Sequence, residues 1–266
     1  TGNTGITFRE TLMVNLDILT YGFAFTSDQG ALGYSTVSLL ETGNRRILID
    51  TGPASRRGWV YQALGDRGLS IEDIDTVVLT HLHWDHCQNT DLFTKAKILV
   101  HPREIDYSRN PNRADSNSAS YFADMLNKLD VEPISEGDSI SEGVSVIDTP
   151  GHTKGHISVI VHINGEDVLV AGDALPDAGT VKRGVPYNIF WDVNDATESV
   201  EKMIDTSKVF YPGHDRPFRL DGDEINYLHG PTQIEFTTSN EGGAATTLVH
   251  TVLAKRPVNV DLVQGR

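Results

Sequence analysis

The stretch His81-Leu82-His83-Trp84-Asp85-His86 places four metal-binding side chains within six residues. It follows the apolar run Thr76–Leu79, whose β-branched residues are typical of a buried strand. The four side chains are therefore predicted to lie on a loop where a strand ends. Neutral imidazole and carboxylate are ligands of Zn²⁺, Fe²⁺ and Mn²⁺. Three His and one Asp exceed what one tetrahedral ion with an open position needs, so the stretch indicates two metals.

The alternative is a His-rich surface loop, and the residues downstream argue against it. Three further predicted strands each lead through a turn of small residues into a His or an Asp. These segments are Val144–Asp148 leading to His152, Asp167–Ala171 leading to Asp173, and Lys208–Tyr211 leading to His214. Four such strand ends imply one shared sheet edge, where loops from separate strands converge on a rigid scaffold.

This set of motifs resembles the metallo-β-lactamase superfamily from about Leu39 to Leu220. The specific pattern is His-x-His-x-Asp-His, followed in order by His, Asp and His. The resemblance implies an α/β fold, the four-layer αββα sandwich. It also implies a ligand set, in which His81, His83 and His152 hold the first metal, Asp85, His86 and His214 hold the second, and Asp173 bridges them. In the early strand and turn Ile47–Gly52, Asp50 would support the site from behind its ligands.

The 266 residues are predicted to form one domain, 1–266, with a C-terminal hairpin extension at about 227–266. A composition of 38% apolar and 22% charged residues is that of a globular protein. No run of eighteen apolar residues is present, so no membrane-spanning helix is expected. Cys87 is the only cysteine, which excludes an internal disulfide and is consistent with a cytoplasmic location. Cys87 is expected to be a small buried residue rather than a ligand.

The net charge of −15 comes from 37 acidic and 22 basic residues. Enzymes that act on polyanionic backbones need basic surface to approach them. We therefore expect neither a nucleic acid partner nor an anionic membrane partner, and the predicted partner is a small-molecule substrate.

Strands and helices alternate as in a layered α/β fold, and a division at about Ser135 gives each half strands followed by a helix, although the halves share too little sequence to be called a repeat. Strands are predicted at Leu12–Leu19, Thr36–Glu41, Arg45–Asp50, Thr76–Thr80, Lys97–His101, Val144–Asp148, Ile157–Ile163, Asp167–Ala171 and Lys208–Tyr211. Helices are predicted at Arg57–Arg67, Pro102–Ser108, Ala119–Leu129 and Ala196–Ile204, the last capped by Asn194-Asp195.

Two segments are less regular. The polar segment Arg109–Ser120 is predicted to be an exposed loop, either a substrate lid or an inert connection. Near the C-terminus, Thr232–Thr238 and Thr246–Ala254 are predicted to pair as a hairpin. An isolated hairpin is marginally stable, so this one would pack on the domain or on a second subunit of a homodimer.

Two divalent ions that share a carboxylate and a water lower the pKa of that water and polarise an acyl oxygen. The sequence thus predicts a metal-dependent hydrolase with two divalent ions, zinc being favoured over iron or manganese. Among superfamily branches the chain is most similar to the acyl-homoserine lactone lactonases, which implies opening of a small lactone. Those enzymes place a Tyr three residues after the bridging Asp, where this chain has Pro176. Tyr187 or Trp191 could replace it, and Asp85 and Tyr187 are the predicted catalytic residues.

Other functions stay open at this point. The ion pair also suits another small ester, a thioester or a cyclic amide. A β-lactamase usually lacks one ligand of the motif, and a thioesterase with an anionic carrier would need basic residues near the C-terminus. A non-catalytic ligand-binding or sensor domain is disfavoured because the ligand set is complete. His156 lies outside the implied ligand set and is expected to orient a ligand or to pack.

Overall fold

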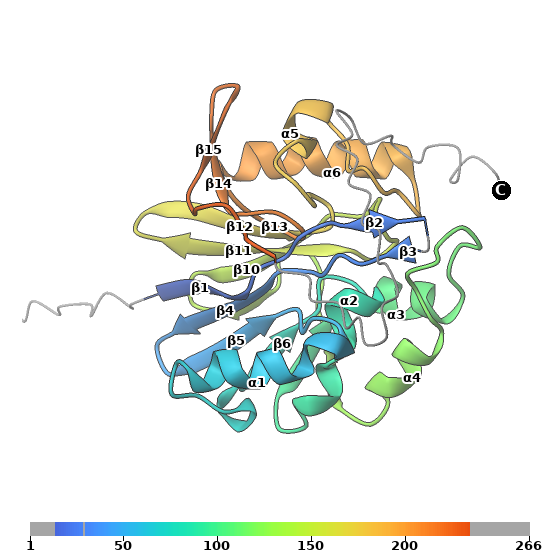
Figure 1. The fold of residues 1–266 in the computed structure, drawn as a ribbon, viewed down its shortest axis with the longest axis vertical. Helices are drawn as coiled ribbons and strands as arrows, with labels where there is room; N and C mark the ends of the chain where they lie inside the picture. The colour runs from blue at the N-terminus through green and yellow to red at the C-terminus, as the bar shows by residue number, and fades with distance from the viewer. Residues whose placement is uncertain (1–13, 29, 235–266) are drawn as a thin grey trace, which may run out of the picture.

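The structure is a computed structural model that describes residues 14–28 and 30–234, and it has four layers. Two mixed β-sheets stack face to face, and helices cover the outer face of each (Figure 1). The predicted αββα sandwich is thereby confirmed. The predicted C-terminal strands Thr232–Thr238 and Thr246–Ala254 lie almost wholly outside the described residues.

The first sheet has six strands in the order β1-β4-β5-β6-β7-β8. They are β1 (Val14–Thr20), β4 (Val37–Thr42), β5 (Arg45–Ile49), β6 (Thr76–Val78), β7 (Lys97–Val100) and β8 (Asp130–Pro133). The β5-β6-β7-β8 pairs are parallel, and β1-β4-β5 are antiparallel. A short separate hairpin joins β1 to β4 and consists of β2 (Thr26–Ser27) and β3 (Gly30–Ala31).

The second sheet has seven strands in the order β15-β14-β13-β12-β11-β10-β9. They are β9 (Ser139–Ser141), β10 (Val144–Asp148), β11 (Ile157–Ile163), β12 (Glu166–Gly172), β13 (Val209–Pro212), β14 (Phe218–Asp221) and β15 (Glu224–Tyr227). Among its described strands, only β12 and β13 pair in parallel. Since β10 and β12 are both antiparallel to β11, the strands β10, β12 and β13 all end at the same edge.

The helices lie outside the two sheets. They are α1 (Arg57–Gly65), α2 (Trp84–Cys87), α3 (Pro102–Arg109), α4 (Tyr121–Leu126), α5 (Thr180–Arg183) and α6 (Val193–Thr206), with short 3₁₀ turns at Ala54–Arg56, Ile71–Asp73 and Thr90–Leu92. In Figure 1, α1 lies below the first sheet and α6 lies above the second. No helix in the described part of the chain combines the length and apolarity that crossing a membrane requires.

Side chains alternate between faces along each strand, and this alternation builds three apolar layers. In β5, Ile47 and Ile49 point between the sheets and meet Val159 and Val161 of β11, whereas Leu48 points outward to the layer beneath α1. The outer layer of the second sheet packs against α6 through residues such as Val200. Both sheets are therefore buried on two faces, which fixes their strand ends firmly.

Most predicted elements are present, with shifted ends. The helix predicted at Ala196–Ile204 is α6, which begins three residues earlier at Val193. Its cap is Asp192 rather than Asn194-Asp195, because the Asp192 carboxylate accepts hydrogen bonds from the backbone N–H groups of those two residues. The predicted helix Ala119–Leu129 shortens to Tyr121–Leu126.

Candidate metal centre

The ends of β6, β10, β12 and β13 bring all seven predicted ligand residues together. Their ligand atoms form three groups, each within 4.8 Å. These groups are His81, His83 and His152; His81, His86 and Asp173; and Asp85, His86 and His214. The first and third match the two sets that the resemblance implied, and Asp173 lies between them. Most of the donor side chains are buried, so each needs a partner inside the protein.

In the first group, the ring nitrogens of His83 and His152 that point away from the centre donate hydrogen bonds to surrounding oxygen atoms. His83 Nε2 donates to Asp115 Oδ2 at 3.1 Å, which leaves Nδ1 facing His152 Nε2 at 2.9 Å. His152 Nδ1 donates to the backbone oxygen of Asn188 at 2.8 Å. Each imidazole therefore keeps one nitrogen with a lone pair turned inward, as a metal ligand requires.

The second group is oriented in the same way. His86 Nδ1 donates to Asp50 Oδ2 at 2.8 Å, and His214 Nδ1 donates to the Tyr34 backbone oxygen at 3.0 Å. His214 Nε2 lies 3.1 Å from Asp173 Oδ2 and 3.4 Å from Asp85 Oδ2.

Asp173 contacts both groups. Its Oδ1 lies 3.3 Å from His86 Nε2, and its Oδ2 lies 3.5 Å from His152 Nε2. A carboxylate in this place suits a bridging ligand.

Three donor atoms in the centre fit a bound cation. His81 Nε2, His86 Nε2 and Asp173 Oδ1 are buried, and none makes a hydrogen bond within the described part of the chain. Burying polar atoms without partners is costly, so such atoms indicate a missing partner. Imidazole nitrogens and carboxylate oxygens without any thiolate suit Zn²⁺, Fe²⁺ and Mn²⁺. The residues present therefore fit divalent metal ions.

The protonation states of the buried histidines also favour the binding of cations. Burial, together with the neighbouring imidazoles, lowers the pKa of His81 well below its ordinary value. Burial likewise lowers the pKa of His152 to about 4, so both rings are neutral at pH 7. For His86, burial opposes the imidazolium, but Asp173 and Asp50 outweigh it and raise the pKa well above the ordinary value. A metal ion would replace the proton that these carboxylates hold on His86.

Asp50 stands at the end of β5, where the resemblance placed it. It adopts a positive φ of 61°, which is uncommon for a residue other than glycine. Its carboxylate accepts hydrogen bonds from the Thr80 backbone N–H at 2.8 Å and from the Thr80 hydroxyl at 2.9 Å, besides His86. Asp50 thus fixes both the start of the metal motif and the ring of one ligand.

His156 orients a ligand rather than joining the ligand set. Its Nε2 accepts the backbone N–H groups of Asp173 at 3.0 Å and Ala174 at 3.2 Å. Its Nδ1 then donates to Thr149 Oγ1 at 2.8 Å. Burial lowers the pKa of His156 well below its ordinary value, which keeps Nε2 available as an acceptor. The interpretation of His156 as an orienting residue agrees with these contacts.

Two carboxylates that sequence reasoning missed support the centre. Glu104, in the first turn of α3, is fully buried and accepts from Leu82 N, Thr153 Oγ1 and Gly155 N at 2.8–3.0 Å. It therefore joins the loop of His81–His86 to the loop of His152. Asp115 carries out a similar task for His83.

The segment Arg109–Ser120 is largely the loop that the sequence predicted, exposed or half-buried at every residue except Asp115, but its middle is tied to the centre. Asp115 is only 5% exposed, and the Trp84 backbone N–H donates to the Asn117 oxygen at 3.1 Å. Asn112 Nδ2 donates to the Phe190 oxygen at 3.0 Å. Polar composition gave no sign that Asp115 is buried, because its partner, His83, is distant in sequence.

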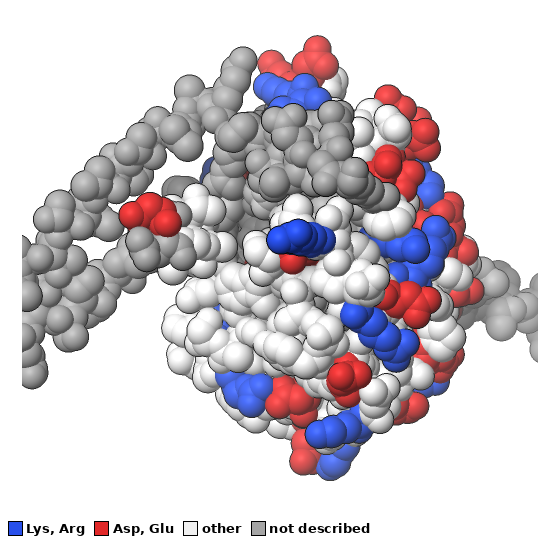
Figure 2. All heavy atoms as spheres, turned by 90° about the vertical axis from the view of Figure 1, so that its right-hand side faces the viewer, with Lys and Arg blue, Asp and Glu red and all other residues white. Residues whose placement is uncertain are grey.

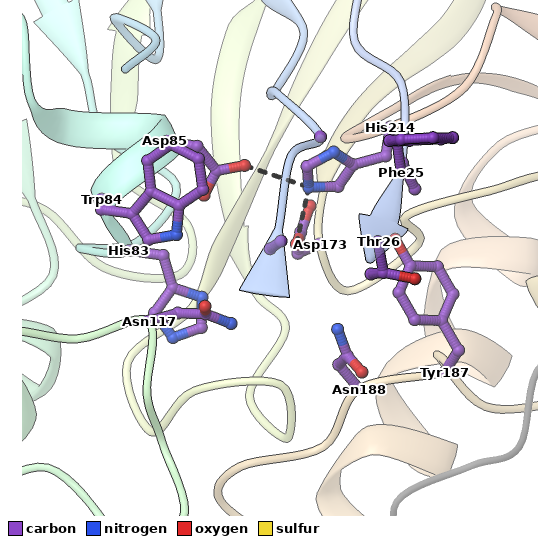
Figure 3. Close-up of a pocket in the computed structure, with 13 residues that line it drawn as sticks. Phe25, Thr26, His83, Trp84, Asp85, Asn117, Asp173, Tyr187, Asn188 and His214 are labelled. Atoms are coloured by element: carbon purple, nitrogen blue, oxygen red, sulfur yellow. Dashed lines mark hydrogen bonds and ion pairs between the residues drawn. The ribbon is translucent and has the colours of Figure 1, made fainter. Parts of the chain in front are cut away.

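A pocket opens directly onto the centre (Figure 3). Its lining residues come from the β2-β3 hairpin and its flanks, the metal motif, the loops that follow α3 and α5, and the ends of β12 and β13. They are Ala24, Phe25, Thr26, Ala31, Gly33, His83, Trp84, Asp85, Asn117, Asp173, Tyr187, Asn188 and His214. None of these is Lys or Arg. Two side-chain amides, Asn117 and Asn188, and the apolar Phe25 and Trp84 are exposed to a substrate there.

Figure 2 shows the end of the molecule where β2, β3 and α3 lie. Charged side chains gather toward the upper, right and lower margins of this face, and the central area is mostly uncharged apart from one basic side chain with an acidic one beneath it.

Of the two aromatic residues considered in place of the lactonase Tyr, only Tyr187 lines the pocket. Trp191 lies outside the lining, and its indole N–H donates to Asp195 Oδ2 at 3.0 Å. Pro176 contributes its backbone oxygen, which accepts from His214 N at 2.8 Å. Cys87 is fully buried in the layer beneath the first sheet and belongs to no ligand group of the described residues.

Comparison with known proteins identifies the family to which this fold belongs. The sequence model of the Metallo-beta-lactamase superfamily matches residues 30–214. The chain belongs to this superfamily.

Relatives in the superfamily agree with a metal-dependent hydrolase. Over 169 residues the chain is 31% identical to the "Probable metallo-hydrolase" of Methanocaldococcus jannaschii, covering 64% of this chain and 70% of that protein. A Bacillus thuringiensis structure with N-decanoyl-L-homoserine at its active site has a TM-score of 0.63 at 22% identity, over 75% of this chain and 92% of the other. A dizinc quorum-quenching lactonase has a TM-score of 0.62 at 18% identity, over 77% and 82%. At these identities the two structures show a shared fold.

Proposed function

We propose that this superfamily hydrolase holds two divalent metal ions and hydrolyses a small, uncharged cyclic ester, such as an acyl-homoserine lactone. The observation that carries the proposal is the pair of donor groups on either side of Asp173, which opens onto a pocket whose described lining contains no Lys or Arg. The bound ions would themselves attract an oxygen anion, but the described lining offers no Lys or Arg away from the metals to hold a separate charged group of the substrate. The net charge of −15 disfavours polyanionic substrates at longer range.

The ions, when bound, would activate water as the nucleophile and polarise the carbonyl oxygen. The protein residues are assigned the remaining tasks. Asp85 lines the pocket with its side chain 9% exposed, so it can accept the proton that the attacking water loses. As the new C–O bond forms, the ring C–O bond breaks, and the leaving oxygen takes that proton from Asp85. Asp85 therefore ends the cycle as a carboxylate again.

Tyr187 is proposed to take the place of the Tyr that the lactonases carry at the position of Pro176. Its side chain lies on the pocket wall opposite the metal motif, across from His83 and Trp84 (Figure 3). A phenol there can donate to the substrate carbonyl or to the leaving oxygen. Asn188 follows it directly and uses its backbone oxygen to hold His152, so Tyr187 is carried on a fixed segment.

Substrate preference is tested with a panel of lactones, thioesters, phosphodiesters and cyclic amides, assayed by proton release with added Zn²⁺ or Mn²⁺. We expect kcat/KM for a neutral lactone to exceed ~10⁴ M⁻¹s⁻¹, the range usual for true substrates. Tyr187→Phe should lower kcat on that lactone, while the control Tyr61→Phe, on an exposed residue of α1, should not. Higher kcat/KM for another class, with every lactone far below this range, would show that the lactonase proposal is wrong.

The dinuclear centre is tested separately by elemental analysis, with close to two ions per chain expected. His83→Ala and Asp173→Ala should each lower that number and abolish hydrolysis, with circular dichroism confirming that the variants fold. At most one ion in the unaltered protein after reconstitution would exclude the dinuclear centre. The cytoplasmic location and the homodimer stay predictions.

A further inference from the structure

Asp115 is a buried carboxylate outside the metal motif, yet it is among the most heavily hydrogen-bonded groups near the centre. Its Oδ2 accepts from His83 Nε2 at 3.1 Å, Tyr107 Oη at 2.8 Å and Ser118 Oγ at 2.9 Å. Its Oδ1 accepts from the backbone N–H groups of Asn117 at 2.9 Å and Ser118 at 3.1 Å. Buried carboxylates are costly unless such donors surround them, so this arrangement fixes the position of Asp115 closely.

One side of this arrangement faces the metal ligand His83. Because the carboxylate can only accept, the proton of the His83 ring is held on Nε2, and Nδ1 is left with its lone pair toward His152. Phe190 lies edge-on against both rings at 5.4 Å, which restricts their rotation. Asp115 therefore selects which nitrogen of His83 is offered to a metal.

The other side of the arrangement shapes the pocket. The two backbone N–H groups bound by Oδ1 fold residues 115–118 into a tight turn, and this turn carries Asn117 into the pocket lining (Figure 3). The turn is joined to the metal motif by an isolated bridge between His83 and Ser118 and by the hydrogen bond from Trp84 N to the Asn117 oxygen. The same carboxylate thus contacts a ligand and builds a wall of the pocket.

We propose that Asp115 is a positioning residue that joins the first metal site to the pocket wall, so that metal binding and the position of Asn117 depend on each other. The inference rests on the dinuclear centre of the proposed function. Energetic coupling between two sites is reciprocal. Metal binding at His83 therefore stabilises the turn, and an intact turn strengthens metal binding.

The test is Asp115→Asn, which keeps the shape but can place an amide N–H against His83. Zn²⁺ affinity is measured by competition with a chromophoric chelator, without substrate. We expect one of the two ions to bind about 10–100-fold more weakly and the other to be unchanged. Asp106→Asn is the matched control, because Asp106 lies in α3, which leads into this loop, and its side chain is 75% exposed. It should leave both affinities unchanged.

Hydrogen exchange of residues 116–119 supplies a second readout. In the unaltered protein, Zn²⁺ should slow exchange of the Asn117 and Ser118 amides, and this effect should disappear in Asp115→Asn. A variant that merely destabilised the fold would lose melting temperature while both ions bound normally, and that result would overturn the proposal. If Asp115→Asn does not fold, Tyr107→Phe decides, since it removes one donor and keeps the carboxylate. Weaker binding of one ion supports the proposal, and unchanged binding of both overturns it. Absence of Zn²⁺ binding by the unaltered protein would instead refute the proposed function.

Discussion

Glu104→Gln is expected to destabilise the protein strongly although Glu104 is no metal ligand. The carboxylate is fully buried and satisfies three donors from two loops, at Leu82, Thr153 and Gly155. Oε1 accepts from Leu82, and Oε2 accepts from the other two. Gln keeps one oxygen, and its NH₂ group must face donors that it cannot bind. Space for rearrangement is small, because a methyl group on Gly155 would lie 2.2 Å from the Glu104 nitrogen.

The magnitude follows from these contacts. A hydrogen bond to a charged group contributes about 1.5–3 kcal/mol to the free energy of unfolding, and Gln loses one or two of the three. Gln also avoids the cost of burying a charge, which shows in the raised pKa of Glu104, where desolvation outweighs the hydrogen bonds. We therefore expect a net loss of about 2–4 kcal/mol. For a domain of this size, that lowers the melting temperature by about 4–16 °C.

Thermal unfolding followed by circular dichroism, with a chelator present, measures this effect apart from metal binding. Glu132→Gln serves as the control, since Glu132 pairs with Lys97 at the surface and its side chain is 53% exposed. Exposed ion pairs contribute little, so its melting temperature should stay close to that of the unaltered protein. A Glu104→Gln melting temperature equal to that of Glu132→Gln would refute the argument that the buried carboxylate holds the two loops together.

Three further predictions concern the centre. Gly213→Ala should displace Asp173, because its added Cβ would lie 2.0 Å from Asp173 Oδ1; elemental analysis should find fewer ions than in Gly65→Ala, whose Cβ meets no atom within 4 Å. Cys87→Ser should keep its metal content, and loss of metal would contradict the assignment of Cys87 to the apolar layer. In the metal-free protein, burial disfavours the His86 imidazolium, but Asp173 and Asp50 raise its pKa well above 6.5. The attraction between protonated His86 and these two carboxylates stabilises the fold fully below about pH 6.5, and it is lost as pH rises through the raised pKa of His86. The melting temperature in chelator should therefore fall from pH 6.5 to 9. A constant or rising value would contradict this.

The sequence was enough to predict those strands and ligand residues that carry strong local patterns. Apolar β-branched runs indicated strands such as β6 and β11, because strands buried on both faces are mostly apolar. The ligand residues were recognisable because each follows such a run at a strand end. The predicted convergence of all seven ligands is confirmed, but the expectation of one shared sheet edge was wrong: β6 belongs to the first sheet and β10, β12 and β13 to the second, and the ends of the two sheets meet.

Features that depend on partners distant in sequence could not be predicted. Glu104 and Asp115 look like ordinary polar residues until their donors are known. Asn188 supports His152 through a backbone oxygen, which every residue possesses. The edge strand β8 (Asp130–Pro133) is too polar to show strand periodicity, because it is paired along one side only.

Because the candidate ligands come from both sheets, the centre is also a junction between the halves of the domain. His81, His83, Asp85 and His86 follow a strand of the first sheet, whereas His152, Asp173 and His214 follow strands of the second. An ion bound by both sets acts as a reversible crosslink across the sandwich. Such an ion at 100 times its dissociation constant would add about 2.7 kcal/mol to the free energy of unfolding. Neither half alone presents a complete site, so metal capture would follow the stacking of the sheets, and a chelator would lower the melting temperature of the protein as well as its activity.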